Sequence, residues 1–202
     1  MDKAQQAAFI EDYTDLKASM GADEVILFGD GVHPTQATKL SHGWIKKGSE
    51  QQIKTTASRT RINLLGTIEL GNLANAITAT YDTINAESII DFMSLLRAQY
   101  LTADTLHWII DGAGYHKAKT VQKKAKELNI QIHILPPYSP NLNPIERLWK
   151  VMNEEARNNE YFHSAKEFRE KIDDFFKHTL PNIADSLNSR INDNFQIIDP
   201  AT

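Results

Sequence analysis

The sequence contains no cysteine, and this absence excludes several kinds of site. A disulfide framework, a thiolate zinc site and a cysteine nucleophile all need that residue. Long apolar runs are also missing, because the longest span a few residues, far short of the ~20 that cross a membrane. The first residues, MDKAQQAAFIEDY, lack the basic and apolar regions of a signal peptide. We therefore expect a cytoplasmic protein with no membrane partner.

An excess of positive charge is missing as well. Lys and Arg number 22 against 26 Asp and Glu, which gives a formal net charge of −4. Nucleic-acid binding usually leaves a basic footprint, so this balance argues against DNA as a partner. The apolar share of 41% in 202 residues is that of a globular chain. We expect one domain over 1–202, with 1–21 as an N-terminal helix or linker and 159–202 as C-terminal helices.

Hydrophobic periodicity predicts a mixed sheet flanked by helices, in the α/β class. Helical spacing or composition is found at 4–19, 86–100, 118–128, 144–158, 164–179 and 181–190. Apolar runs at 25–28 and 106–110 are typical of strands buried on both faces, and 130–134 alternates as a half-buried strand does. The stretches 61–70 and 76–81 predict two antiparallel strands around Gly71-Asn72. Short β-prone pieces fill the rest of 42–70.

Three acidic residues are candidates for chemistry. Two apolar runs end in an aspartate, at Phe28-Gly29-Asp30 and at Ile109-Ile110-Asp111. Active sites of open α/β sheets collect beyond the strand ends, so neighbouring strands would bring these carboxylates together. Glu146 lies in the first turn of the predicted helix that follows a proline-rich loop. The 34 residues between Asp111 and Glu146 suffice for a helix, a strand and a return to the same edge.

Clustered carboxylates repel one another and raise one another's pKa values unless a cation joins them. Oxygen ligands without cysteine suit Mg²⁺ or Mn²⁺, and two such ions can support phosphodiester cleavage. Each acid also has a structural alternative. Asp30 and Asp111 each precede a glycine and could form turns. Asn143-x-x-Glu146 is nearly a capping box, in which Glu146 would only stabilise the start of its helix.

Three segments resemble the catalytic motifs of DDE transposases, in the mariner-like branch that includes many bacterial insertion sequences. LPPYSPNLNPIERLW (135–149) resembles the third motif, WIIDGAGYH (108–116) the second, and LFGDGVHPT (27–35) the first. The resemblance covers about residues 22 to 158. It implies an RNase H-like fold with a mixed five-stranded sheet, related to retroviral integrases. By motif, it makes Asp30, Asp111 and Glu146 the catalytic and metal-binding triad.

The resemblance also implies the partners. These are two Mg²⁺ or Mn²⁺ ions and double-stranded DNA, as transposon ends and target, bound by a homodimer at the bacterial nucleoid. Gly31 and Gly112 depart from the residues that many members carry after the two aspartates. The N-terminal helix-turn-helix region of the family is expected to be absent here. The chain would then be an isolated catalytic domain, an expressed fragment or the second half of a split reading frame.

Other functions remain as alternatives. A non-catalytic transposase remnant could bind DNA or a partner without cutting, although all three acids are retained. A general RNase H-like nuclease would share the acids, but the proline loop argues against it. A small-molecule phosphohydrolase would use the same metals and would need a closed pocket.

Several further residues are weighed for auxiliary roles. His33 and His116 each follow a catalytic aspartate and could orient a metal-bound water or contact phosphate, or could simply bond to loop backbone. Arg147 could pair with an acid or a phosphate. Lysines after the second motif are candidates for DNA contacts, namely Lys117, Lys119, Lys123 and Lys124. Tyr138 could stack on an unpaired base, although packing against the prolines is the simpler expectation. Trp149 is expected in the core.

Overall fold

The computed structural model describes residues 2–198 and contains one five-stranded mixed sheet. The strand order is β3-β2-β1-β4-β5. β1 pairs antiparallel with β2 and parallel with β4, β4 pairs parallel with β5, and β3 pairs antiparallel with β2. The strands are β1 (Glu24–Val32), β2 (Asn63–Ile68), β3 (Ile77–Tyr81), β4 (Thr105–Ile110) and β5 (Ile130–Ile134).

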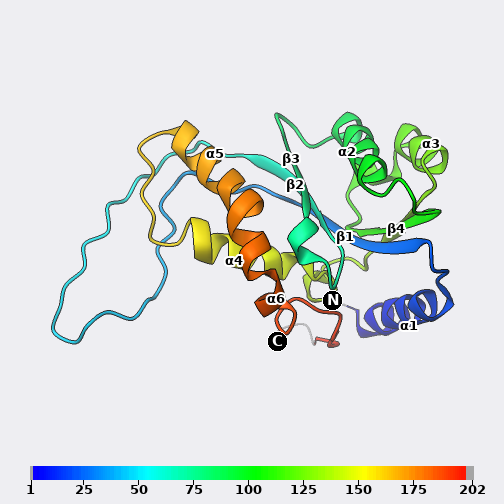
Figure 1. Ribbon diagram of the computed structural model, residues 1–202, viewed down its shortest axis with the longest axis horizontal. Coiled ribbons are helices and arrows are strands. Elements are labelled where there is room, and N and C mark those ends of the chain that lie inside the picture. Colours follow the sequence, from blue (N-terminus) through cyan, green and yellow to red (C-terminus); the bar gives the residue numbers. More distant parts are fainter. Residues whose placement is uncertain (1, 199–202) are drawn as a thin grey trace.

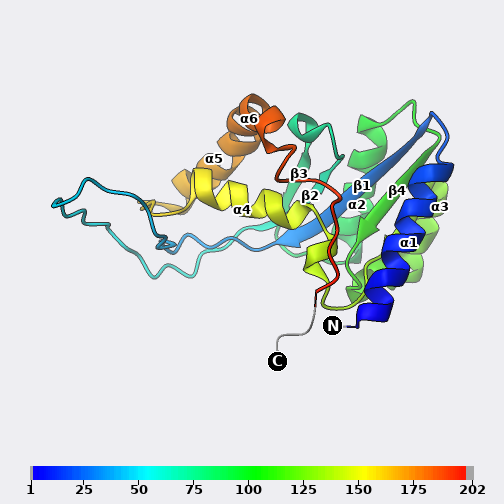
Figure 2. The same ribbon diagram turned by 90° about the horizontal axis from the view of Figure 1, so that it is seen from below.

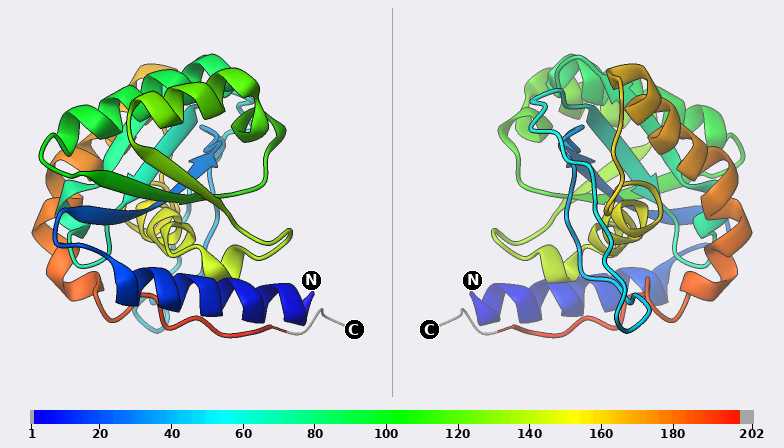
Figure 3. Two further views of the ribbon diagram at one scale, coloured as in Figure 1. Left: turned by 90° about the vertical axis from the view of Figure 1, so that its right-hand side faces the viewer. Right: turned by 90° about the vertical axis from the view of Figure 1, so that its left-hand side faces the viewer.

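Helices cover both faces of this sheet. α2 (Ala86–Gln99) and α3 (Lys119–Glu127) lie on one face, and α1 (Lys3–Ser19) and α4 (Ile145–Ala156) lie on the other (Figures 1 and 3). α5 (Ala165–Asp174) and α6 (Leu180–Leu187) pack on the side of α4 (Figure 2). Two apolar clusters result, one beneath α2 and α3 and one beneath α1, α4, α5 and α6.

β1 is the central strand, and its side chains alternate between these two clusters. Leu27 packs beneath α2 and α3, while Phe28 packs on the opposite face with α1 and α4. This period of two places Gly29 on the α2 side and Asp30 on the α4 side. The alternation therefore decides which helix meets the first acidic residue.

The predicted elements are largely confirmed, with a few differences. The run at 25–28 was expected to end at Gly29-Asp30, but β1 continues to Val32, since β2 pairs with it from Phe28 to Val32. The helices expected at 164–179 and 181–190 form one continuous rod through a π-helical turn, Phe175–Thr179. Pro181 in the first turn of α6 has no N–H to donate, and the wider π turn accommodates that missing bond.

The β-prone pieces between 42 and 60 do not form strands. Residues 36–60 leave the sheet as a long extended segment, closed at its base by a bridge between Thr35 and Arg61 (Figure 1). Trp44 in this segment is fully exposed. Within residues 2–198, no helix is long and apolar enough to cross a membrane.

Candidate active site

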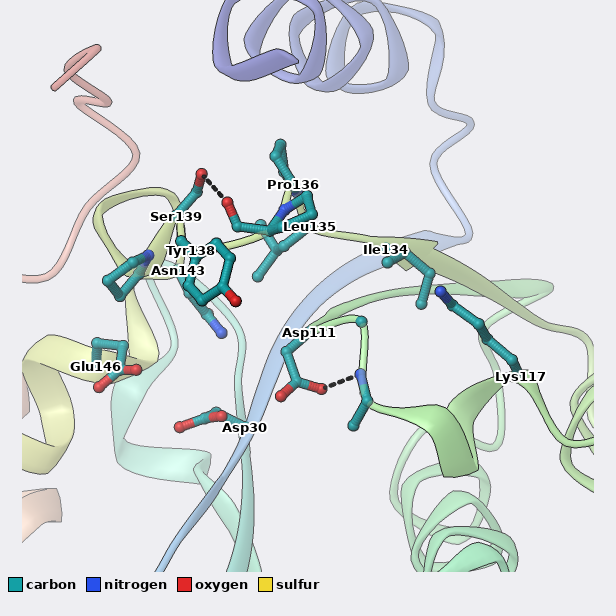
Figure 4. A pocket seen from close by; sticks show the side chains of 14 residues that line it. Asp30, Asp111, Lys117, Ile134, Leu135, Pro136, Tyr138, Ser139, Asn143 and Glu146 are labelled. Carbon is teal, nitrogen blue, oxygen red and sulfur yellow. Dashed lines mark hydrogen bonds between the residues drawn. The ribbon is translucent and has the colours of Figure 1, made fainter. Parts of the chain in front are cut away.

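Asp30, Asp111 and Glu146 line one pocket of about 510 Å³. Asp30 comes from β1, Asp111 directly follows β4, and Glu146 lies in the first turn of α4. The opposite wall is the proline-rich loop, including Pro136 and Pro137. In Figure 4, the three carboxylates face the same hollow, with Asp30 between the other two. Residues far apart in the sequence therefore converge at one edge of the sheet.

Asp30 is half-buried, and among the three acids its pKa is shifted most by its surroundings. The indole Nε1 of Trp149 donates a hydrogen bond to its Oδ2 at 2.8 Å. Burial raises the pKa of Asp30 to about 7, and the charges of Glu146 and Asp111 act in the same direction. The N–H groups of Trp149 and Gly31 oppose this rise in pKa. In the absence of a cation, this carboxyl group therefore retains its proton at higher pH than an ordinary aspartate does.

Asp111 is more exposed and is held in place on one side. Its Oδ1 lies 3.2 Å from Nε2 of His116 and accepts the Ala113 N–H at 3.1 Å. The hydrogen bond with His116 lowers the pKa of Asp111. Both contacts fall on the same oxygen, which turns the other oxygen toward Asp30 (Figure 4). His116 is buried, so this contact fixes the orientation of the Asp111 carboxylate, a role that the sequence did not indicate.

Glu146 does not act in a capping box. The expected N-cap, Asn143, makes no side-chain bond to the helix start, and its Nδ2 instead donates to the Gly29 carbonyl at 3.0 Å. This bond ties the proline loop to the residue before Asp30. Glu146 is half-buried, and burial raises its pKa, while Lys150 opposes that rise. Its side chain lines the pocket, so the capping alternative is wrong.

The three acids line the pocket without enclosing an ion as they stand. Among residues 2–198, no group of three or more His, Asp or Glu side chains has the geometry of a metal centre. Hydrogen bonds fix one oxygen of Asp30 at Trp149 and one oxygen of Asp111 at His116, which leaves the second oxygen of each carboxylate for an ion. Unbalanced carboxylates also repel one another. The donor set, oxygen atoms only, nevertheless suits a hard divalent cation.

The remaining candidate residues lie in varied places. Lys117 lines the pocket, and a shallow hollow on α3 combines it with Lys119, Lys123 and Lys126. Lys124 lies outside that hollow, 3.8 Å from Glu127. The sequence-based grouping of the lysines is thus only partly reproduced.

Two other candidates point away from the acids. Nδ1 of His33 lies 2.9 Å from Oδ1 of Asn63, outside the pocket. Arg147 donates to the backbone carbonyl of Asn192 at 2.8 Å, so it holds the C-terminal segment rather than an acid.

Tyr138 does not pack against the prolines. Its side chain is 83% exposed at the mouth of the pocket, and its backbone φ is +56°. A positive φ is unfavourable for an aromatic residue, and such strain concentrates at functional loops. The simpler expectation for this residue is therefore wrong.

Trp149 is the residue whose role the sequence did not reveal. It is buried, as expected, but its indole also bonds to a catalytic candidate. The available signal was its spacing, since Trp149 follows Glu146 by three residues on one helix face. The partner of its N–H depends on the register of a distant strand and could not be read from that spacing.

These features define the class to which the chain belongs. The family model of the DDE superfamily endonucleases matches residues 25–169, and the chain belongs to that family. The chain is similar to the insertion element IS630 uncharacterized 39 kDa protein of Shigella sonnei, with 24% identity over 162 residues. This match covers 79% of the chain and 47% of the relative, so the chain spans about half of that relative's length.

A second relative is the uncharacterized protein y4pE/y4sA of Sinorhizobium fredii (strain NBRC 101917 / NGR234). It is 41% identical over 54 residues, which are 27% of the chain and 38% of the relative.

Solved structures establish the fold. A pre-cleavage Mos1 transpososome matches with a TM-score of 0.64 and 18% identity, covering 97% of this chain and 65% of that one. The catalytic domain of Mos1 mariner transposase matches with a TM-score of 0.56 and 17% identity, covering 96% and 93%. The five-stranded mixed sheet with its flanking helices is therefore the RNase H-like fold of that catalytic domain.

Proposed function

We propose that this chain, 1–202, is the catalytic domain of an insertion-sequence transposase, which cleaves DNA phosphodiesters and transfers the strand. The observation that carries this proposal is the convergence of Asp30, Asp111 and Glu146 on one pocket. Membership of the DDE superfamily endonucleases supports it. The relative of Shigella sonnei belongs to an insertion element, and Mos1 has been solved in a strand transfer complex.

The three acids are proposed to hold two Mg²⁺ or Mn²⁺ ions. The oxygen-only donor set supports this, and Mos1 paired-end complexes have been solved with Mn and with Mg. When bound, such ions activate a water or 3′-hydroxyl for attack and stabilise the leaving oxygen. The contribution of His116 and of the Ala113 N–H is to fix one oxygen of Asp111.

The surface beside the pocket supports a DNA partner. Lys117 lies in the pocket wall, and Lys119 and Lys123 extend the same basic surface along α3. We propose that these lysines, with Lys124, contact the phosphate backbone, which offsets the net charge of −4 locally. We also propose that Tyr138 stacks on an unpaired base near the cleaved bond, which its exposure at the pocket mouth supports.

Transposition must pair two DNA ends, so the DNA complex is proposed to contain two copies of the chain. We propose that this DNA cleavage and strand transfer take place on chromosomal DNA at the bacterial nucleoid.

A plasmid assay tests the activity. Supercoiled plasmid incubated with Mn²⁺ should be nicked by the wild-type chain and not by Asp111→Asn. Asp104→Asn is the matched control, because it makes the same substitution at the other end of β4 and should nick at the wild-type rate. Equal nicking by wild type and Asp111→Asn, or none by the wild type, would contradict the proposed function.

A further inference from the structure

Trp149 makes a hydrogen bond to Asp30 that neither the resemblance of the third motif nor the proposed metal-binding role of the three acids accounts for. Its side chain is 3% exposed, and its Nε1 donates to Oδ2 of Asp30 at 2.8 Å. Buried indole groups need a partner for this N–H, and a carboxylate is among the strongest acceptors. Glu146 and Trp149 lie three residues apart on α4. One face of this helix therefore carries both the third acid and the hydrogen-bond donor to Asp30.

The space for this indole comes from Gly66. Gly66 is the residue directly opposite Asp30 in the β1–β2 pair. A Cβ built at Gly66 would lie 2.3 Å from Cη2 of Trp149 and 3.0 Å from Cζ2. Any side chain at position 66 would therefore push the ring away from the strand and away from Asp30. On its outer side, the ring packs against Phe176 at a centroid distance of 6.2 Å.

We infer that Trp149 is a positioning residue for the Asp30 carboxylate, and that Gly66 is required because it admits the indole. This inference rests on the proposed function, in which Asp30 holds a metal ion. Groups that hydrogen-bond to a ligating carboxylate fix its orientation and tune metal affinity. Because Trp149 and Glu146 share α4, the bond also fixes the first acid relative to the helix that carries the third.

The other face of the sheet provides a matched control. Trp108 donates its Nε1 to Oγ1 of Thr67 at 3.1 Å, and its ring covers Gly29, the residue opposite Thr67. Both indoles thus lie over a glycine and bond to the residue across the β1–β2 pair. Only the bond of Trp149 reaches a catalytic candidate.

The first test compares Mn²⁺ affinity in Trp149→Phe and Trp108→Phe. Each substitution keeps an aromatic ring and removes one buried N–H donor. Calorimetric titration should show affinity reduced about tenfold in Trp149→Phe and reduced clearly less in Trp108→Phe, whose ring bonds to no acid and only packs against His116. Thermal unfolding of both variants measures how much each substitution destabilises the fold. If Trp149 had only a structural role, Trp149→Phe would lower the unfolding temperature without lowering the Mn²⁺ affinity.

The second test uses the wild-type chain, so it does not depend on how a variant folds. The three tryptophans give three indole N–H signals in a ¹H–¹⁵N spectrum. Addition of Mg²⁺ should shift the signal of Trp149 far more than those of Trp108 and Trp44.

A third test uses Gly66→Ala, which keeps the indole but displaces it. This variant should show the same loss of Mn²⁺ affinity as Trp149→Phe.

The outcomes separate this inference from the proposed function. If the wild type binds Mn²⁺ and Trp149→Phe binds it equally well, the positioning role is wrong and the triad stands. A Trp149 signal that does not respond to Mg²⁺ bound by the wild type would overturn the role in the same way. If the wild type binds neither ion, the metal site itself is wrong, and the inference is overturned with it.

Discussion

The three acidic residues at the pocket differ in the charge they carry before any cation binds. The pKa of Asp111 is lowered by His116, whereas burial raises the pKa values of Asp30 and Glu146. The site thus holds one firmly ionised carboxylate and two that retain protons more readily. A divalent ion must displace those protons, so we expect metal binding to strengthen as the pH rises toward and past 7.

Asp30 should destabilise the metal-free fold at neutral and higher pH. Its pKa rises from 3.8 to about 7 on folding, so the folded chain binds more protons than the unfolded chain between these values. Stability should therefore fall as the pH rises from about 4 to 7. Asp30→Asn cannot ionise and should be more stable than wild type by ~2–4 kcal/mol at pH 8, with no such gain at pH 4.

Chemical denaturation at the two pH values measures this difference. Asp104→Asn, at the other end of β4, controls for the loss of one negative charge. A constant difference between Asp30→Asn and wild type from pH 4 to pH 8 would contradict the raised pKa of Asp30.

At the scale of the elements, hydrophobic period and composition together located most of the helices and strands. The spacing at 86–100 and the alternation at 130–134 match α2 and β5 closely. Element ends were less predictable, because they depend on partners. β1 extends through Asp30 since β2 pairs with it, and Asn143 leaves the helix cap to bond the Gly29 carbonyl. Neither partner lies near its residue in the sequence.

The lysines of α3 form an element-scale feature that can be tested as a unit. Replacing Lys119, Lys123 and Lys124 by Gln should weaken DNA binding and flatten its salt dependence. The slope of log affinity against log salt should decrease by about 2–3, since each lost phosphate contact removes about 0.9. Filter binding or fluorescence anisotropy at several salt concentrations measures this slope.

A matched control is the triple replacement of Lys166, Lys171 and Lys177 on α5 and its continuation, which removes the same charge elsewhere. It should leave the slope near the wild-type value. Equal effects of the two triple variants would show that α3 has no special role in DNA binding.

At the scale of the whole molecule, the three motifs carried most of the prediction. They identified the fold and the three acids, which the structure then brings to one pocket. The contacts around the acids could not be predicted. That Trp149 meets Asp30 depends on the β1–β2 register and on Gly66, and that Arg147 bonds Asn192 depends on the path of the C-terminal segment.

The central claim is that Asp30, Asp111 and Glu146 form a divalent-cation site. A calorimetric Mn²⁺ titration of wild type, Asp111→Asn and Glu146→Gln tests it most directly, with Asp104→Asn as the control. Binding by the wild type and the control, lost or greatly weakened in the other two variants, is the predicted result. No binding by the wild type, or equal binding by all four proteins, would contradict the claim.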